Sequence, residues 1–317
     1  MTVLSDQVLR DVPAPTGMLP STGRRGSRLR LSPWRHAWFL EGFTWLYLLW
    51  MIVPIVVAVI FSFNSGKSTS AWRGFSTQWW SGNPNTAVFS NPEMQHAIYQ
   101  SLVLAGLTTL ITVPIGVAFA IGIDRWKTRT AGSLNFVMIF SFVVPELLLA
   151  VALFFVVTQL FHFIPLGTTA EVAGLVVFNI SWPALVVRAR LITIGKTYEE
   201  AAADLGASRV QALTRVLARM LVPAIFASAI LVFAGVIDDF VIVEQLSSTA
   251  NTQPMSVLIY SNVHGGIAGP ALNALATIML GLSFVVALVG FVVYRFLTRG
   301  ERGSKGTAEA LTSIAGM

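Results

Sequence analysis

Six long runs of apolar residues alternate with shorter polar segments along this chain. The runs cover residues 38–63, 97–123, 134–161, 172–187, 220–246 and 271–296. A helix rises about 1.5 Å per residue, so about 20 apolar residues cross a bilayer core of about 30 Å. We therefore predict an all-α integral membrane protein with six transmembrane helices. Prolines lie inside these runs, among them Pro54, Pro114, Pro145 and Pro183. Such breaks are more typical of a gated pathway than of a passive anchor.

The polar segments define the predicted organisation. Residues 1–37 form a basic tail, and residues 64–96 form a long outer loop rich in aromatic side chains. Residues 97–296 form a five-helix core with a polar loop at 188–219, and residues 297–317 form a second tail. The first apolar run is longer than the core of a signal peptide, so we expect it to remain as the first transmembrane helix, kinked at Pro54. The aromatic residues of the outer loop suit either an interfacial belt or a docking surface for an external partner.

The basic residues are distributed unevenly between the two sides of this predicted topology. Of the 21 lysines and arginines, 19 lie on the side that holds both tails and the 188–219 loop, and only Lys67 and Arg73 lie on the other. Short loops rich in Lys and Arg stay in the cytoplasm, so we expect both termini there, in a bacterial-type inner membrane. This bias also accounts for the net charge of +6, and we expect no nucleic-acid partner. The absence of cysteine excludes disulfides and thiolate metal sites.

The 188–219 loop contains a charged segment whose pattern predicts two short helices joined at a glycine. Thr197 with Glu200 has the spacing of a capping box, and Ser208 with Gln211 repeats it. Gly206 stands where a left-handed residue would end the first helix. An eight-residue helix is not stable alone, so we expect its apolar face to rest on the protein and its acidic side to meet a partner. That face consists of Tyr198, Ala201, Ala202 and Leu205.

Within this segment, Glu200-Ala201-Ala202 is followed after three residues by Gly206 and after nine more by Val216. This spacing resembles the EAA loop of ABC-importer permeases. The family usually has a Leu-Pro pair two residues after the valine position, whereas here the residues are Ala218-Arg219. The resemblance implies a type I ABC-importer permease fold whose cytoplasmic loop carries a coupling helix that docks on an ATPase subunit. It assigns that coupling to Glu199, Glu200, Ala201, Ala202, Asp204, Leu205 and Gly206.

Acidic residues inside the apolar runs are the candidates for a solute pathway. Glu146 follows Pro145 in the middle of the third run, and Asp238 and Asp239 lie in the outer third of the fifth, with Glu244 nearby. A charge at the bilayer centre is costly, so such a residue is a functional candidate by default. An unpaired acidic set would attract a cation. The structural alternatives are that Glu146 bonds backbone freed by Pro145, and that the other acids lie at the wet end of their helix.

The sequence offers no catalytic or nucleotide-binding motif. Gly66-Lys67-Ser68 has Phe61 where a phosphate-binding loop needs its first glycine, and the four histidines show no metal-ligand spacing. We therefore expect no cofactor and no metal on this chain, and no enzymatic activity. ATP and Mg would belong to a separate ATPase chain. An intramembrane aspartyl pair formed by Asp238 and Asp239 is geometrically poor because neighbours on a helix point about 100° apart.

Further segments resemble the spermidine/putrescine subgroup of ABC-importer permeases: residues 101–105 (SLVLA), 144–150 (VPELLLA), 237–240 (IDDF) and 254–280. The resemblance implies import of polyamines by alternating access. It also implies two ATPase subunits, a second permease subunit that is usually a paralogue, and an external solute-binding protein. Permeases for iron, thiamine or phosphonates share much of this pattern and are the alternative. A stand-alone channel would leave the EAA-like loop unexplained.

Overall fold

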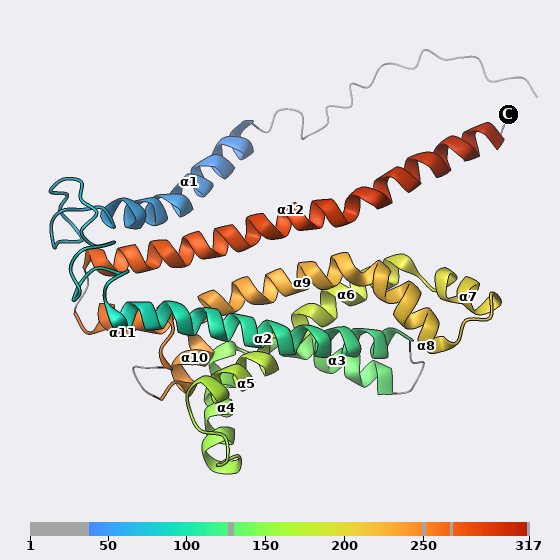
Figure 1. Cartoon of the computed structure of the whole chain (residues 1–317), viewed down its shortest axis with the longest axis horizontal. Coiled ribbons are helices and arrows are strands. Elements are labelled where there is room, and N and C mark those ends of the chain that lie inside the picture. Colours follow the sequence, from blue (N-terminus) through green and yellow to red (C-terminus); the bar gives the residue numbers. More distant parts are fainter. Residues whose placement is uncertain (1–37, 126–129, 249–251, 267–268, 316–317) are drawn as a thin grey trace, which may run out of the picture. The chain divides into compact units, whose positions relative to one another are not determined.

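A computed structural model describes residues 38–125, 130–248, 252–266 and 269–315. The basic tail predicted for residues 1–37 lies outside the described residues. The described chain is helical, with an isolated bridge between Asn64 and Phe75 as its only strand-like pairing (Figure 1). It divides into two compact units, Met1–Val53 and Pro54–Met317, and helix α1 (Trp38–Phe61) runs from the first into the second.

Five helices or helix groups in the described chain are long and apolar enough to cross a membrane. They are Trp38–Phe61, Pro92–Arg125, Thr168–Ile194, Arg209–Asp238 and Pro270–Phe296. A bent pair, Gly132–Val143 with Glu146–Leu160, makes a sixth if it counts as one span. This count agrees with the six predicted spans. The last helix, α12, continues without a break to Ala315.

The third predicted span is not one helix. It consists of α3 (Thr130–Val143), α4 (Glu146–Phe155) and the π-helical segment η1 (Val156–Leu160), with a bend of 105° between the two halves. Pro145 lacks an amide hydrogen and disfavours helical backbone at Val144, which explains why the helix ends there. By contrast, α1 continues through Pro54 and α2 (Pro92–Arg125) through Pro114. The run over 134–161 is therefore a span broken at Pro145, in agreement with the break predicted there.

Two other boundaries differ from the predicted ones. The fourth span is formed by α5 (Thr168–Asn179) and α6 (Ser181–Ile194), so the helix extends into the predicted 188–219 loop. The fifth run is interrupted: α9 (Ala218–Asp238) ends, and α10 (Val241–Leu246) begins after two residues. The Asp239 side chain stabilises this restart, because its Oδ1 accepts a hydrogen bond from the Ile242 amide, in the first turn of α10, at 3.2 Å.

Helix α2 lies at the centre of the core and contacts α5, α6, α9 and α11 (Met255–His264). Small residues permit this close packing. Gly116 of α2 lies directly against Pro183 of α6, and Gly174 of α5 lies against Ile242 and Leu246 of α10. Gly116 therefore permits the close contact between α2 and α6. The buried core therefore joins the helices that carry the candidate site residues.

The loop between α1 and α2 has a folded interior of its own. Asn64 is buried, and its amide nitrogen donates to the carbonyls of Ser68 and Ala71, both at 2.9 Å. The Trp79 indole donates to the Asn64 carbonyl at 2.6 Å. Other aromatic side chains face outward, namely Trp72, Phe75 and Phe89. The loop thus presents aromatic surface on a fixed frame.

Candidate functional site

The EAA-like segment folds as two short helices with a tight turn between them. Helix α7 covers Thr197–Asp204, and α8 (Arg209–Gln211) leads through the π-helical η2 (Ala212–Leu217) into α9. Gly206 has φ of 83°. Its amide donates to the Ala203 carbonyl at 2.9 Å, and the Ala207 amide donates to the Ala202 carbonyl at 3.0 Å. This pair of bonds is a Schellman motif, so the left-handed helix end predicted at Gly206 is confirmed.

Of the two predicted capping boxes, one forms. The Ser208 hydroxyl accepts from the Gln211 amide, and the Gln211 side chain accepts from the Ser208 amide at 2.9 Å. The predicted box at Thr197 does not form, because α7 begins one residue earlier, after Lys196. Thr197 is already helical, and no side chain caps the helix. Glu199 occupies the third helical position, and its carboxylate is engaged elsewhere.

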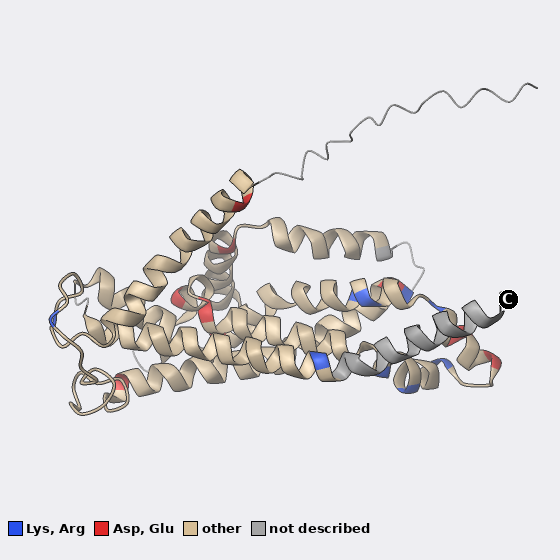
Figure 2. Ribbon diagram, turned by 90° about the horizontal axis from the view of Figure 1, so that it is seen from above, with Lys and Arg blue, Asp and Glu red and all other residues tan. Residues whose placement is uncertain are grey.

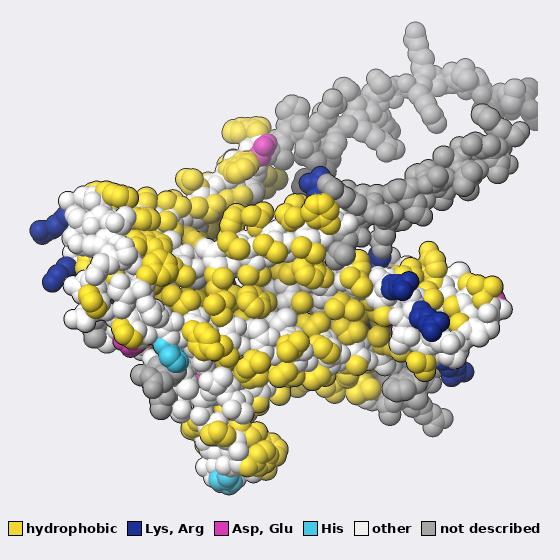
Figure 3. Space-filling view, viewed as in Figure 1, with side chains coloured by type: hydrophobic (Ala, Val, Ile, Leu, Met, Phe, Trp, Pro, Cys, Tyr) yellow, Lys and Arg dark blue, Asp and Glu magenta, His cyan; other side chains and the backbone are white. Residues whose placement is uncertain are grey.

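The expectation that the apolar face of α7 rests on the protein was wrong. Tyr198 is 54% exposed and Leu205 is 90% exposed. Helix α7 packs on η2, and Ala202 is its partly buried apolar residue. Figure 3 shows hydrophobic side chains and basic residues together over the end that carries α7 and α8. The surface offered by this loop is therefore apolar as well as acidic, since Glu200 and Asp204 are exposed too.

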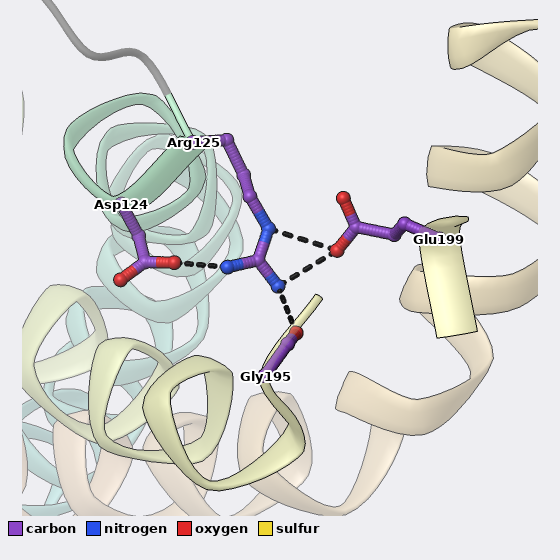
Figure 4. A network of polar contacts seen from close by, with 4 residues as sticks. All are labelled: Asp124, Arg125, Gly195 and Glu199. Carbon is purple, nitrogen blue, oxygen red and sulfur yellow. Dashed lines mark hydrogen bonds and ion pairs between the residues drawn. The ribbon is translucent and has the colours of Figure 1, made fainter. Parts of the chain in front are cut away.

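Glu199 instead joins α7 to the end of α2 (Figure 4). Its Oε1 accepts from Arg125 Nε at 2.8 Å and lies 2.7 Å from Arg125 Nη2. Nη2 also donates to the Gly195 carbonyl at 2.8 Å, and Nη1 is paired with Asp124. The side chains of Arg125 and Glu199 are only 14% and 24% exposed. One guanidinium therefore links α2, the end of α6 and α7.

The structure brings two of the three predicted pathway acids together. Glu146 lies in the first turn of α4 and Asp239 lies between α9 and α10, and their carboxyl groups lie close enough to interact electrostatically. Helices α4 and α10 pack against each other, which holds the pair in place. The Ser256 hydroxyl donates to the Asp239 carbonyl at 2.7 Å. Figure 2 shows that Lys and Arg instead gather toward the ends of the long helices.

Asp238 points into different surroundings from its neighbour. It is exposed, receives a bond of 3.4 Å from the Ser283 hydroxyl, and lines an open pocket of about 340 Å³. Three neighbouring rings also line this pocket: the ring centroids of Phe240 and Tyr260 are 4.2 Å apart, and those of Tyr260 and His264 are 3.9 Å apart. The other lining residues are Ser256, Ile259, Val263 and Met279. A carboxylate beside aromatic faces is suited to an organic cation.

Residues 112–303 match the family described as the binding-protein-dependent transport system inner membrane component. The match covers more than half of the chain and includes the EAA-like loop and all three candidate acids. This chain belongs to that family of ABC-importer permeases. Membership confirms the predicted transport role, in which the permease subunit is not the catalytic one, and it establishes a multi-pass inner-membrane protein.

Known relatives of the permease agree with this assignment. It is 32% identical over 279 residues to the putrescine transport system permease protein PotI of Escherichia coli (strain K12), covering 86% of this chain and 93% of PotI. It is 28% identical over 262 residues to the spermidine/putrescine transport system permease protein PotC of the same strain, covering 83% and 96%. The predicted resemblance to the spermidine/putrescine subgroup is confirmed.

Among solved structures, the permease resembles a chain of a bacterial ABC transporter involved in the import of the acidic polysaccharide alginate. The TM-score is 0.62 at 16% identity, with 83% of this chain and 96% of that chain covered. This similarity confirms the predicted all-α permease fold.

Sequence reasoning missed Glu171 of the permease. It falls between the third and fourth predicted spans, yet it lies in the first turn of α5 and is completely buried. Gln100 of α2 donates to Glu171 Oε2 at 3.0 Å and to Thr168 Oγ1 at 2.8 Å. A glutamine within an apolar run was the available signal, because a polar group there needs a partner. The contact ties the N-terminal part of α2 to the start of α5.

Proposed function

We propose that this permease imports polyamines, of the putrescine and spermidine class, from an external binding protein to the cytoplasm by alternating access. The observation that carries the proposal is the Asp238 pocket. An exposed carboxylate at the end of an apolar helix is disfavoured against lipid, so its face suits a solute path or a subunit interface. Polyamines present ammonium groups on methylene chains, which match a carboxylate beside apolar and aromatic walls.

The second acidic feature extends the same path. Glu146 and Asp239 form a paired acidic group on neighbouring elements, and no Lys or Arg lies within the apolar runs away from their ends. The Asp238 pocket and the pair of Glu146 and Asp239 then provide two acidic positions, each of which binds one ammonium group of the same polyamine. Among the alternatives, a phosphonate carries the wrong charge for this set. A cationic solute such as thiamine or iron is the second candidate, because the same acids would attract it.

We propose that ATP drives this movement from a separate pair of ATPase subunits, which hold the ATP and Mg. The contact on this chain would be the segment from Glu199 to Gly206, with Glu200, Ala201, Ala202, Asp204 and Leu205 at its surface. The exposed Tyr198 and Leu205 give that contact an apolar component. A second permease, a paralogue in our proposal, completes the pathway. Both tails and α7 lie in the cytoplasm in this arrangement, and residues 64–96 lie outside.

Uptake in cells tests the solute class. A strain lacking this chain is compared with the same strain carrying it, using labelled putrescine, spermidine, thiamine, iron and a phosphonate. We expect polyamine uptake alone to depend on the chain. Loss of uptake of another solute, with unchanged polyamine uptake, would agree with an importer but refute polyamines as its solute.

Two variants then test the acids. Asp238→Asn and Asp239→Asn should each lower polyamine uptake about tenfold, because each removes a charge that binds the cation more strongly than an amide does. Glu93→Gln, which neutralises an exposed acid at the outer start of α2, is the matched control and should have no effect. An equal effect of both aspartate variants on a neutral solute would indicate a structural role instead.

A further inference from the structure

The contact between Arg125 and Glu199 joins two elements that the chain itself connects only over a long distance. Glu199 belongs to α7, the segment proposed to meet the ATPase, and Arg125 is the last residue of α2. Both side chains are largely shielded from water, and the guanidinium engages one carboxylate oxygen through two nitrogens. Charge-assisted bonds of this kind are about twice as strong as neutral ones. A movement of α7 would therefore act directly on α2.

The same guanidinium also fixes the segment that leads into α7. It binds the carbonyl of Gly195, the residue that ends α6 with φ of 70°. Asp124 holds its opposite side. Because the guanidinium is planar, these three partners together determine its orientation. Lysine could not reproduce this arrangement, since its ammonium is a single point of charge.

Helix α2 extends from this contact to the outer half of the core. Near its outer end, Ser101 Oγ accepts a hydrogen bond from the Met255 amide at 2.9 Å, at the start of α11. Helix α11 contributes Tyr260 and His264 to the pocket that contains Asp238. The described contacts therefore form a continuous series from α7 through Arg125 and α2 to the wall of the proposed solute pocket.

We propose that Arg125 is a positioning residue that transmits ATPase-driven movement of α7 to α2, and through α2 to the outer pocket. This inference rests on the proposed function of α7 as the ATPase contact. It makes the coupling depend on a side-chain contact within this chain, in addition to any contact that α7 makes with the ATPase. The consequence is a class of variants that assemble and hydrolyse ATP but transport poorly.

The test measures ATP hydrolysis and putrescine uptake in the same proteoliposomes containing the complete transporter with its binding protein. Arg125→Gln, Glu199→Gln and the exchanged pair Arg125→Glu with Glu199→Arg are compared with the parent. Coupling between sites typically spans 5–150-fold, so we expect each single variant to lower uptake per ATP about tenfold while assembly and hydrolysis persist. Because a glutamate at position 125 would face the Asp124 carboxylate and the Gly195 carbonyl, the exchanged pair should recover only part of that loss. Arg209→Gln, at an exposed arginine of α8 outside the network, is the control and should be unaffected.

Several results would overturn the inference. Normal uptake per ATP in Arg125→Gln would do so, as would a loss of ATPase assembly in that variant. A defect in Glu199→Gln with a normal Arg125→Gln would mean that Glu199 acts on the ATPase instead. If Arg125→Gln fails to insert, Glu199→Gln provides the test: normal uptake per ATP in that variant would show that the contact does not transmit the movement. Failure of the parent transporter to take up any polyamine would refute the proposed solute, and the same ratio would then be measured with the solute that it does carry.

Discussion

At the residue scale, Gly206 closes α7 with a backbone conformation that side chains disfavour. Its φ of 83° lies in the left-handed region, and a Cβ at this position would meet no atom within 4 Å. Glycine is therefore required here for its backbone conformation and not because a side chain would lack space. Its amide also donates to the Ala203 carbonyl. Proline would remove that donor and force φ to about −65°.

We expect Gly206→Pro to abolish uptake and association with the ATPase subunits while the protein still inserts. Gly206→Ala should cost about 1 kcal/mol locally. Gly206→Asn should be milder, because asparagine tolerates the left-handed region. Co-purification of the ATPase with the permease, together with uptake, measures all three. Unchanged uptake in Gly206→Pro would refute the role of this helix end in coupling.

Glu171 raises a different question at this scale, since a completely buried carboxyl group is costly unless it is bonded. Glu171→Ala should lower the free energy of unfolding by about 1–3 kcal/mol, because Gln100 loses a buried acceptor. Glu171→Gln keeps an acceptor oxygen and should lose less. Thermal unfolding of the purified permease in detergent compares the two. Equal melting temperatures for Glu171→Ala and the parent would show that the contact with Gln100 contributes nothing.

At the element scale, close helix packing depends on glycines with contacts and not on glycines in general. A Cβ on Gly116 would overlap the Pro183 ring, whereas one on Gly106, in the same helix, would meet nothing within 4 Å. We expect Gly116→Val to destabilise the protein by about 1–3 kcal/mol by forcing α2 and α6 apart. Gly106→Val is the matched control with little effect. Melting temperatures in detergent distinguish them, and equal values would contradict the packing argument.

Breaks in the helices also position the candidate site. The bend at Pro145 places Glu146 at the start of α4, and the interruption at Asp239 separates α9 from α10. Backbone amides at a helix start favour a carboxylate. The acids of the proposed pathway therefore lie at helix breaks, where backbone amides without a partner inside the helix can donate hydrogen bonds to the carboxylates.

At the scale of the whole molecule, the proposed orientation follows from the basic residues and can be measured directly because the chain contains no cysteine. Thr69→Cys, in the loop after α1, and Ala203→Cys, on α7, are both exposed positions. An impermeant maleimide should label Thr69→Cys in intact cells and Ala203→Cys only after permeabilisation. A strain without the ATPase subunits keeps α7 uncovered. Labelling of Ala203→Cys in intact cells would show that the topology is the reverse of the proposed one.

Much of the fold was predictable because the length and apolar composition of a segment are enough to identify a membrane-spanning helix. The turn at Gly206 and the box at Ser208 were predictable too, since both depend on neighbours within a few residues. The first capping box, Thr197 with Glu200, was predicted incorrectly because α7 begins one residue earlier, after Lys196. This start makes Glu199 the third helical residue, and Glu199 binds Arg125, which is 74 residues away in sequence. The exposed face of α7 was missed because helical spacing shows which residues share a face but not what covers it.

The sequence by itself determined the spans, the charge asymmetry, the EAA-like loop and the family resemblance. Each of these depends on composition or on short spacings, which hydrophobic burial and local hydrogen bonding translate directly into structure. Only the tertiary structure decided that Glu146 meets Asp239, that Asp238 faces an aromatic pocket, and that Arg125 holds α7. These contacts join residues far apart in the chain, and their geometry depends on where helices break and how closely they pack.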